Sequence, residues 1–278
     1  MATDVSQAEW NATTFAAKEN LLRIVQKEAQ AFFTLAEAPE NWRMPTAAGH
    51  WQVCDIVAHL VDTTEGYIRR FETTRGGGTA EGIAPLTDMS HNANKFAQEL
   101  RNIPREELLG RLHSAFDTAM TMFDEVGDQD WDSFIVVHAY MGPLPAFFYP
   151  IAQVMDYGVH GWDVREGLQM SHFMDPDAAD ILVPFMFVLW QATTDTSRLQ
   201  GSDLDVAVRV SGRNAGTTRL KVTKDGMVYE PGDEEGAQVV LDFDPASLVL
   251  TAFGRARSGT PYGDQDAARR FAGLFFRI

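Results

Sequence analysis

The feature that most constrains the fold is a change of hydrophobic period near Gly201. Before this residue, apolar side chains recur every three or four positions over long segments, as they do along one face of a helix. After it, Leu and Val occupy alternate positions of residues 204–210, as in a half-buried strand. We therefore predict an α+β protein, with a helical bundle over residues 1–200 and a small α+β domain over residues 201–278.

The helical part divides at prolines, glycines and polar loops. A proline at position 104 suits the first turn of a helix, and three consecutive glycines at 76–78 end another. Residues 128–144 are predicted to be irregular. The predicted helices span about 13–36, 51–74, 89–101, 104–126, 145–167 and 176–196, and in the last part strands near 204–210, 220–222, 227–230 and 238–243 precede helices near 245–256 and 265–275.

Composition excludes several classes of partner. The formal net charge of −16 disfavours nucleic acids and anionic membranes, whose phosphates would be repelled. No apolar run reaches the roughly 18 to 20 residues of a membrane span, and the first residues lack an export signal. A single cysteine, Cys54, excludes an intrachain disulfide. We expect a cytoplasmic protein, monomeric or homodimeric, that acts on small molecules.

Three residues indicate a metal site. Asp156 and His160 are four positions apart, so on a helix they project from one face, and His59 lies on another predicted helix. Two imidazoles and one carboxylate can hold a single cation and leave a fourth position open, as catalytic sites do. The alternatives are a core histidine at 59 and an exposed ion pair between 156 and 160.

The surroundings of the second pair favour the metal interpretation. Met155, Val159 and Trp162 indicate that this segment is partly buried, where an unpartnered carboxylate would be costly. Asp163 lies one turn from His160, where it could orient the imidazole, pair with an arginine or act as a fourth ligand. Cys54 is expected to pack rather than react. The remaining histidines show no ligand spacing and are interpreted as ordinary: His50, His91, His113, His138 and His172.

These segments resemble a known family. Residues 51–60, Trp-Gln-Val-Cys-Asp-Ile-Val-Ala-His-Leu, resemble the signature of mycothiol-dependent maleylpyruvate isomerases, which have a DinB-like metal-binding four-helix domain. The Asp-x-x-x-His-x-Trp-Asp segment at 156–163 resembles the second metal motif of that family. Residues 253–255, Phe-Gly-Arg, resemble part of its second domain, which has a sterol-carrier-like α/β fold. One departure is Asp156, since the family has glutamate there.

The resemblance implies a metal-dependent enzyme that uses mycothiol. Zinc or another divalent metal, held by His59, Asp156 and His160, would convert the mycothiol thiol to a thiolate. In an isomerase the thiolate adds to a conjugated double bond, the resulting single bond rotates, and elimination restores the alkene. In a transferase the thiol remains on an electrophilic substrate.

Two further residues complete this hypothesis. Asp163 would support catalysis from beside the metal, and Arg255 would contact the substrate carboxylate and the thiol cosubstrate through its bidentate guanidinium. The alternative for Arg255 is a solvated surface position. The alternative for the whole protein is a carrier that binds a small apolar molecule or lipid without chemistry.

Overall fold

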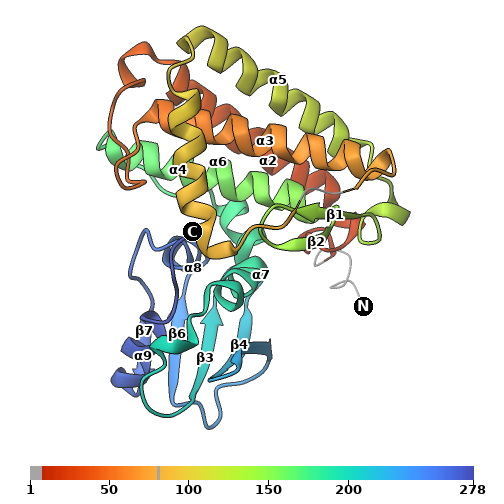
Figure 1. The fold of residues 1–278 in the computed structure, drawn as a ribbon. Helices are drawn as coiled ribbons and strands as arrows, with labels where there is room; N and C mark the ends of the chain where they lie inside the picture. Colours follow the sequence, from red (N-terminus) through yellow and green to blue (C-terminus); the bar gives the residue numbers. More distant parts are fainter. Residues whose placement is uncertain (1–7, 80–81) are drawn as a thin grey trace. The chain divides into compact units, whose positions relative to one another are not determined.

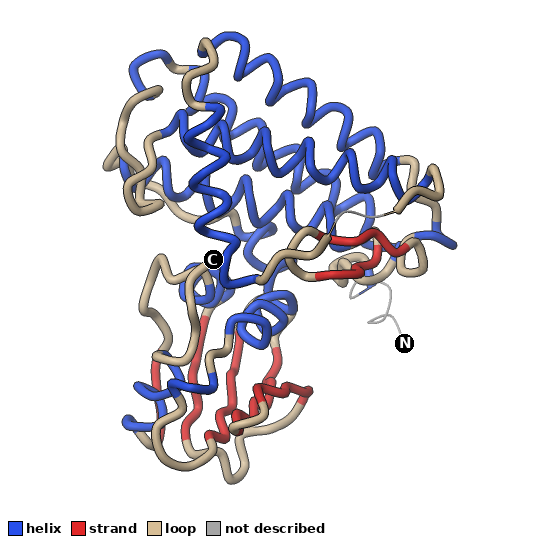
Figure 2. Tube along the Cα trace, in the orientation of Figure 1, coloured by secondary structure: helices blue, strands red, loops and turns tan. Residues whose placement is uncertain are grey.

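The computed structural model describes residues 8–79 and 82–278. The chain divides into two compact units, Met1–Ala178 and Ala179–Ile278. The first is mainly helical and the second contains the larger sheet, which confirms the predicted α+β class (Figure 1, Figure 2). None of the described helices is both long and apolar enough to cross a membrane.

The first unit is a bundle of four long helices with a fifth helix and a hairpin packed against it. Helix α2 packs against α6, and α3 packs against α5 and α4; Figure 1 shows α2, α3, α5 and α6 running side by side. Edge-to-face rings of Phe33, Phe116 and Tyr157 fill the centre of the bundle. The elements are α2 (Lys18–Glu37), α3 (Val53–Arg75), α4 (Met89–Leu100), α5 (Arg105–Asp124), β1 (Ile135–His138), β2 (Gly142–Pro145) and α6 (Phe148–Gly167).

The start of α3 is fixed by a capping box. The Gln52 backbone N–H donates to Asp55 Oδ2 over 2.9 Å, and the Gln52 side chain accepts from the N3 backbone. Two otherwise unpaired helix N–H groups are satisfied in this way. Arg101, directly after α4, holds the cap by ion-pairing with Asp55 and donating to Gln52 Oε1. Asp55 of the 51–60 motif therefore caps the helix, whereas His59, one turn later, takes no part in the cap.

The segment predicted to be irregular contains a two-stranded hairpin. Ile135 pairs with Pro145, and His138 pairs with Gly142, in antiparallel register. The strands are only four residues long, and the second has proline at positions 143 and 145, which usually disfavours a strand. Here the hairpin is stabilised from outside, since β1 packs against α3 and Arg70 donates to the Val137 carbonyl over 3.0 Å.

The second unit is a five-stranded sheet with order β5-β4-β3-β6-β7. All neighbours are antiparallel except β3 and β6, which are parallel. Strand β7 was not predicted, because it is a short edge strand that contains a proline. The elements are α7 (Pro176–Thr193), β3 (Leu204–Val210), β4 (Gly216–Thr223), β5 (Gly226–Pro231), β6 (Val239–Phe243), α8 (Pro245–Ala252), β7 (Thr260–Gly263) and α9 (Gln265–Ala272).

Most of α7 falls in the second unit, whereas the sequence placed this helix in the bundle and the boundary at residues 200/201. The reason is an aromatic cluster around Trp190. Its ring stacks on Phe275 with centroids 5.3 Å apart and meets Phe271 and Phe243 at 5.4 and 6.3 Å. Large apolar side chains of α7 are therefore buried against the sheet and α9. Sequence periodicity shows that a helix is buried but not against which partner.

Candidate metal centre

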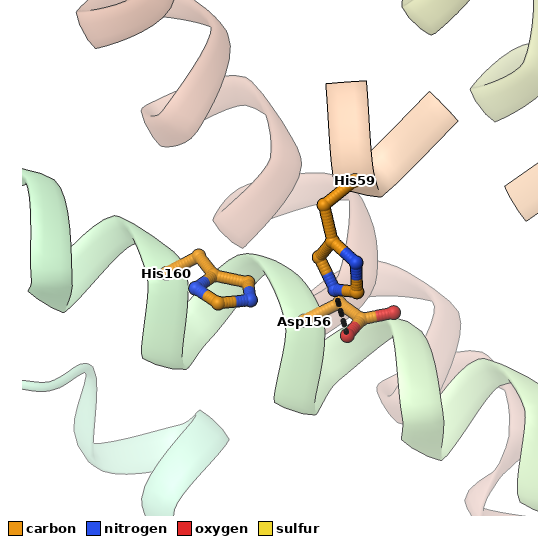
Figure 3. A group of neighbouring side chains, drawn as sticks. All are labelled: His59, Asp156 and His160. Atoms are coloured by element: carbon orange, nitrogen blue, oxygen red, sulfur yellow. Dashed lines mark ion pairs between the residues drawn. The ribbon is translucent and has the colours of Figure 1, made fainter. Parts of the chain in front are cut away.

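Three side chains from two helices of the first unit converge as predicted. His59 of α3 and Asp156 and His160 of α6 each offer a ligand atom, and these atoms lie within 4.8 Å of one another. His59 Nε2 is 3.9 Å from Asp156 Oδ1 (Figure 3), and the two imidazole centroids are 5.1 Å apart. The side chains of His59, Asp156 and His160 are 16%, 18% and 12% exposed, so the cluster lies close to the surface without being open to it.

The antiparallel pairing of α3 with α6 brings these residues together. Thr64 lies against Gln153 and Tyr67 against Tyr149, so the α6 number falls as the α3 number rises. Extending this register by one to two turns places His59 opposite residues 156–160. Side chains on a helix tilt toward its N-terminus, and in this register the opposite tilts of the two helices bring His59 and His160 toward each other.

The residues present fit a divalent cation. Asp156 Oδ2 is buried and has no hydrogen-bond partner among the described residues, and burial without a partner is costly for a carboxylate. Metal–ligand bonds of about 2.1 Å in a tetrahedron place ligand atoms about 3.4 Å apart. The observed separations of up to 4.8 Å require only a small contraction. Two imidazole nitrogens and one carboxylate oxygen form a donor set that suits zinc.

Both imidazoles are held by neighbours. His160 Nδ1 lies 3.0 Å from Oδ2 of Asp163, whose side chain is fully buried, so its Nε2 is the nitrogen available to a cation. His59 Nδ1 faces the Thr63 hydroxyl at 3.5 Å. The Trp51 ring packs beside both imidazoles at 5.2 and 6.0 Å, and Asn94 of α4 accepts its indole N–H. Such neighbours fix ring orientation and tautomer.

The other predicted residues have defined surroundings. Asp163 contacts His160 and lies on the same helix. Arg255 belongs to the second unit, where its Nη1 donates to the Phe253 carbonyl over 2.9 Å. Cys54 is buried, and its sulfur accepts from Arg43. Burial and the adjacent Asp55 raise the pKa of the Cys54 thiol, which agrees with a packing role.

His138, which the sequence analysis interpreted as ordinary, lies in a buried and aromatic environment. This residue ends β1, is only 6% exposed, and lies among the rings of Tyr67, Phe148 and Tyr149. Burial, helped by the nearby Arg70 charge, lowers its pKa to about 4. The run Ile-Val-Val-His, with its β-branched residues, was the available indication of a strand.

Burial also acts on acidic groups near α3. It raises the pKa of Tyr67 well above the usual value, and the Asp156 carboxylate adds to that shift. Burial raises the pKa of Asp62, one turn from His59, and the charges of His59 and Arg69 reduce this upward shift. The influence of Asp156 on Tyr67 shows that the polar groups of this interface are electrostatically linked.

The fold and the cluster of two histidines and one carboxylate place the protein among four-helix bundles with a candidate metal site. Comparison with known proteins gives the family. A profile of the mycothiol maleylpyruvate isomerase N-terminal domain family matches residues 25–165, about half of the chain, so the chain belongs to that family. The resemblance found in the sequence is thereby confirmed. No curated protein sequence matches significantly.

Solved structures show the same fold over almost the whole chain. One is a mycothiol-dependent maleylpyruvate isomerase, with a TM-score of 0.60, 13% identity, and coverage of 89% of this chain and 95% of that chain. Another is a histidine-to-alanine mutant of an enzyme of that name, with a TM-score of 0.58, 14% identity and the same coverage. At this identity the likeness shows that the two-part fold is shared.

Proposed function

We propose that the protein is a metal-dependent enzyme that uses mycothiol. It either isomerises a small electrophilic substrate or attaches the thiol to that substrate. The observation that carries this proposal is the convergence of His59, Asp156 and His160 beside a buried, unpartnered carboxylate oxygen. Membership in the maleylpyruvate isomerase domain family supports the choice of thiol and of reaction. Maleylpyruvate is the first substrate to test.

Each residue has a distinct task in this proposal. His59, Asp156 and His160 would hold a divalent cation, most suitably zinc, which would lower the pKa of a thiol so that it ionises at neutral pH. Asp163 keeps the proton of His160 on Nδ1, so that Nε2 faces the site. Trp51 covers both imidazoles and limits the access of water. Arg255 pairs with a substrate carboxylate through two parallel N–H groups.

The carrier alternative has less support. Carriers of apolar molecules need an unfilled apolar interior. In the second unit the space beneath the sheet is occupied by packed rings, since Trp190, Phe271 and Phe275 lie 5.1 to 5.4 Å from one another. The convergent polar cluster of the first unit also has no role in an apolar carrier.

Metal analysis and kinetics on the full chain test the proposal. We expect one divalent metal per chain, lost to background in His59→Ala and His160→Ala. His113→Ala is the matched control, because His113 is partly exposed and pairs with Glu37. Turnover of maleylpyruvate should require mycothiol and should stop when a chelator removes the metal. Full metal content in both ligand variants would overturn the site, and turnover indifferent to thiol would overturn the mechanism.

A second arm tests the arginine. Arg255→Met should lose roughly 2 to 4 kcal/mol of transition-state stabilisation if the guanidinium pairs with a desolvated carboxylate. Arg257→Met is its control, since Arg257 is an exposed arginine two positions further along the same loop. Equal kinetics for the two variants would return Arg255 to a structural role.

A further inference from the structure

We propose that Tyr67 and His138, with the charge of Arg70 behind them, form a second binding subsite that donates hydrogen bonds to an anionic oxygen of the substrate, a carboxylate or an enolate. This inference rests on the proposed function, because it assigns the groups that hold the substrate while the thiol occupies the metal centre. None of these residues belongs to the two motifs that carry the family resemblance.

The tautomer of His138 is fixed by the hairpin turn. Its Nδ1 accepts the backbone N–H groups of Tyr140 and Met141, over 3.2 and 3.1 Å. A nitrogen that accepts from N–H groups cannot carry a proton, so the single proton of the neutral ring is on Nε2. The low pKa that burial produces keeps the ring neutral at physiological pH. His138 is therefore a neutral donor with a defined direction.

Tyr67 places a second donor beside this ring. The two ring centroids are 5.9 Å apart, and Tyr67 also packs edge-on against Tyr149 at 5.1 Å. Tyr67 is two turns after His59 on α3, about 12 Å along the helix axis. Its side chain tilts toward the N-terminus of α3, and therefore back toward the metal centre. The raised pKa of the phenol keeps it protonated, as a donor must be.

Both donors lack an acceptor. Tyr67 is 8% exposed and His138 is 6% exposed, and neither the Tyr67 hydroxyl nor His138 Nε2 has a hydrogen bond to the described residues; neither atom is among the fully buried unpaired atoms, so both keep some accessible surface. By contrast, the other phenol of this cluster is satisfied, since Tyr149 donates to the Val136 carbonyl over 3.1 Å. An acceptor for these two donors can therefore come from a bound ligand.

The local charge selects an anionic acceptor. Arg70 donates to the Val137 carbonyl, next to His138, and its charge acts on both His138 and Tyr149. The nearby Asp156 carboxylate would oppose an anion, but a divalent cation at the metal centre reverses that effect. Two donors beside the Arg70 guanidinium are suited to stabilising negative charge on oxygen.

Three variants separate this subsite from general packing. Tyr67→Phe removes only the hydroxyl and keeps the ring contacts. His138→Asn keeps an acceptor in the position of Nδ1 for the turn and removes the Nε2 donor. Tyr149→Phe is the matched control, because it removes a phenol of the same cluster whose donor is already used inside the chain.

Binding of maleate to the zinc-loaded full chain is measured by calorimetry, together with metal content. We expect Tyr67→Phe and His138→Asn to weaken maleate binding at least 10-fold at unchanged zinc content, and Tyr149→Phe to bind as the wild type does. In ¹⁵N NMR spectra the Nε2–H signal of His138 should shift when maleate is added. Wild-type affinity in both variants, no binding of maleate to the wild type, or loss of zinc from the variants would overturn the subsite. Failure of the proposed function would instead appear as a wild-type protein without metal or without thiol-dependent turnover.

Discussion

The two units differ in what they bury. The buried polar residues described in the second unit, Asp180 and Thr193, are internally satisfied: Asp180 accepts from the Arg213 backbone N–H, and the Thr193 hydroxyl donates to the Leu189 carbonyl. One further buried side-chain atom of this unit, Arg270 Nε, has no partner among the described residues. The first unit buries more such groups, and several lie at the α3–α6 interface or beside it. Among the described residues of the first unit, the buried polar side chains are Glu28, Thr46, Asp55, Thr64, His138, Gln153 and Asp163.

The first unit therefore contains polar groups that suit chemistry but lower its stability, whereas the second unit is built mainly for stability. Buried polar groups stabilise a fold only when they are fully hydrogen-bonded, and each buried donor or acceptor without a partner lowers the stability of the bundle. In the described part of the first unit, the buried side-chain atoms without a hydrogen-bond partner include Asp156 Oδ2, which belongs to the candidate metal centre, and the hydroxyl of Tyr157, the next residue on α6. The others are Asp55 Oδ1, Arg105 Nε and His172 Nδ1. The sheet unit instead gains its stability from packed rings and places its charges on the outer face of the sheet.

The largest effect is expected in the ring cluster of the second unit. Trp190 is 2% exposed and contacts four other aromatic rings. Trp190→Ala should therefore lower the free energy of unfolding of this unit by about 3 to 5 kcal/mol, measured by denaturant titration. Metal content below the transition should stay at the wild-type level. Loss of metal in this variant would contradict the division between the units.

The second effect is a dependence of stability on pH that arises in the first unit. His138 has a folded pKa of about 4 against 6.5 in the unfolded chain, so its contribution is complete above pH 6.5. As the pH falls from 6.5 to 4 the unfolded state binds more protons, and about 2 to 3 kcal/mol should be lost. Stability curves of the wild type and His138→Asn should converge over this range. Parallel curves, or the same convergence in the exposed-histidine variant His91→Asn, would refute it.

A smaller effect is expected beside the metal. Asp163→Asn keeps the shape of a fully buried side chain but removes the charge that holds His160. Metal affinity should fall about 10- to 100-fold, as competition with a chelator would measure. Asp117→Asn, on the exposed face of α5, is the control. Complete loss of metal would instead make Asp163 a direct ligand, and unchanged affinity would leave it without a role at the site.

The smallest effect is expected on the outer face of the sheet. Arg209 pairs with Asp242 and Glu234 there, and this exposed network is screened by water and salt. Arg209→Met should leave the thermal unfolding midpoint of the second unit unchanged within measurement error. A large drop would show that surface charge, and not the ring cluster alone, stabilises this unit.

The sequence predicts the long helices well because each buries a wide apolar stripe. The four-residue spacing of Asp156 and His160 is also sufficient to place both side chains on one face of a helix, where the structure has them. The pairing of α3 with α6, which decides whether His59 joins them, lies beyond what periodicity can show; the family resemblance supplied it.

Other features depend on tertiary partners that the sequence does not display. The hairpin around His138 is too short and too rich in proline to be predicted from alternation, and it is held by Arg70 and α3. The placement of α7 is decided by where Trp190 finds its ring partners. The role of Asp55 as a helix cap became clear only with Gln52 and Arg101 in place.

The proposed metal ligands come from helices separated by roughly a hundred residues of chain, and this separation has a consequence for the amount of the protein in the cell. Closing so long a loop costs the unfolded chain considerable entropy, so the assembled three-ligand site exists only in the folded state. A cation present at a thousandfold its dissociation constant would stabilise the folded state by about 4 kcal/mol. Steady-state abundance follows the unfolded fraction that proteases can degrade. Metal scarcity would therefore reduce the amount of the protein as well as its activity.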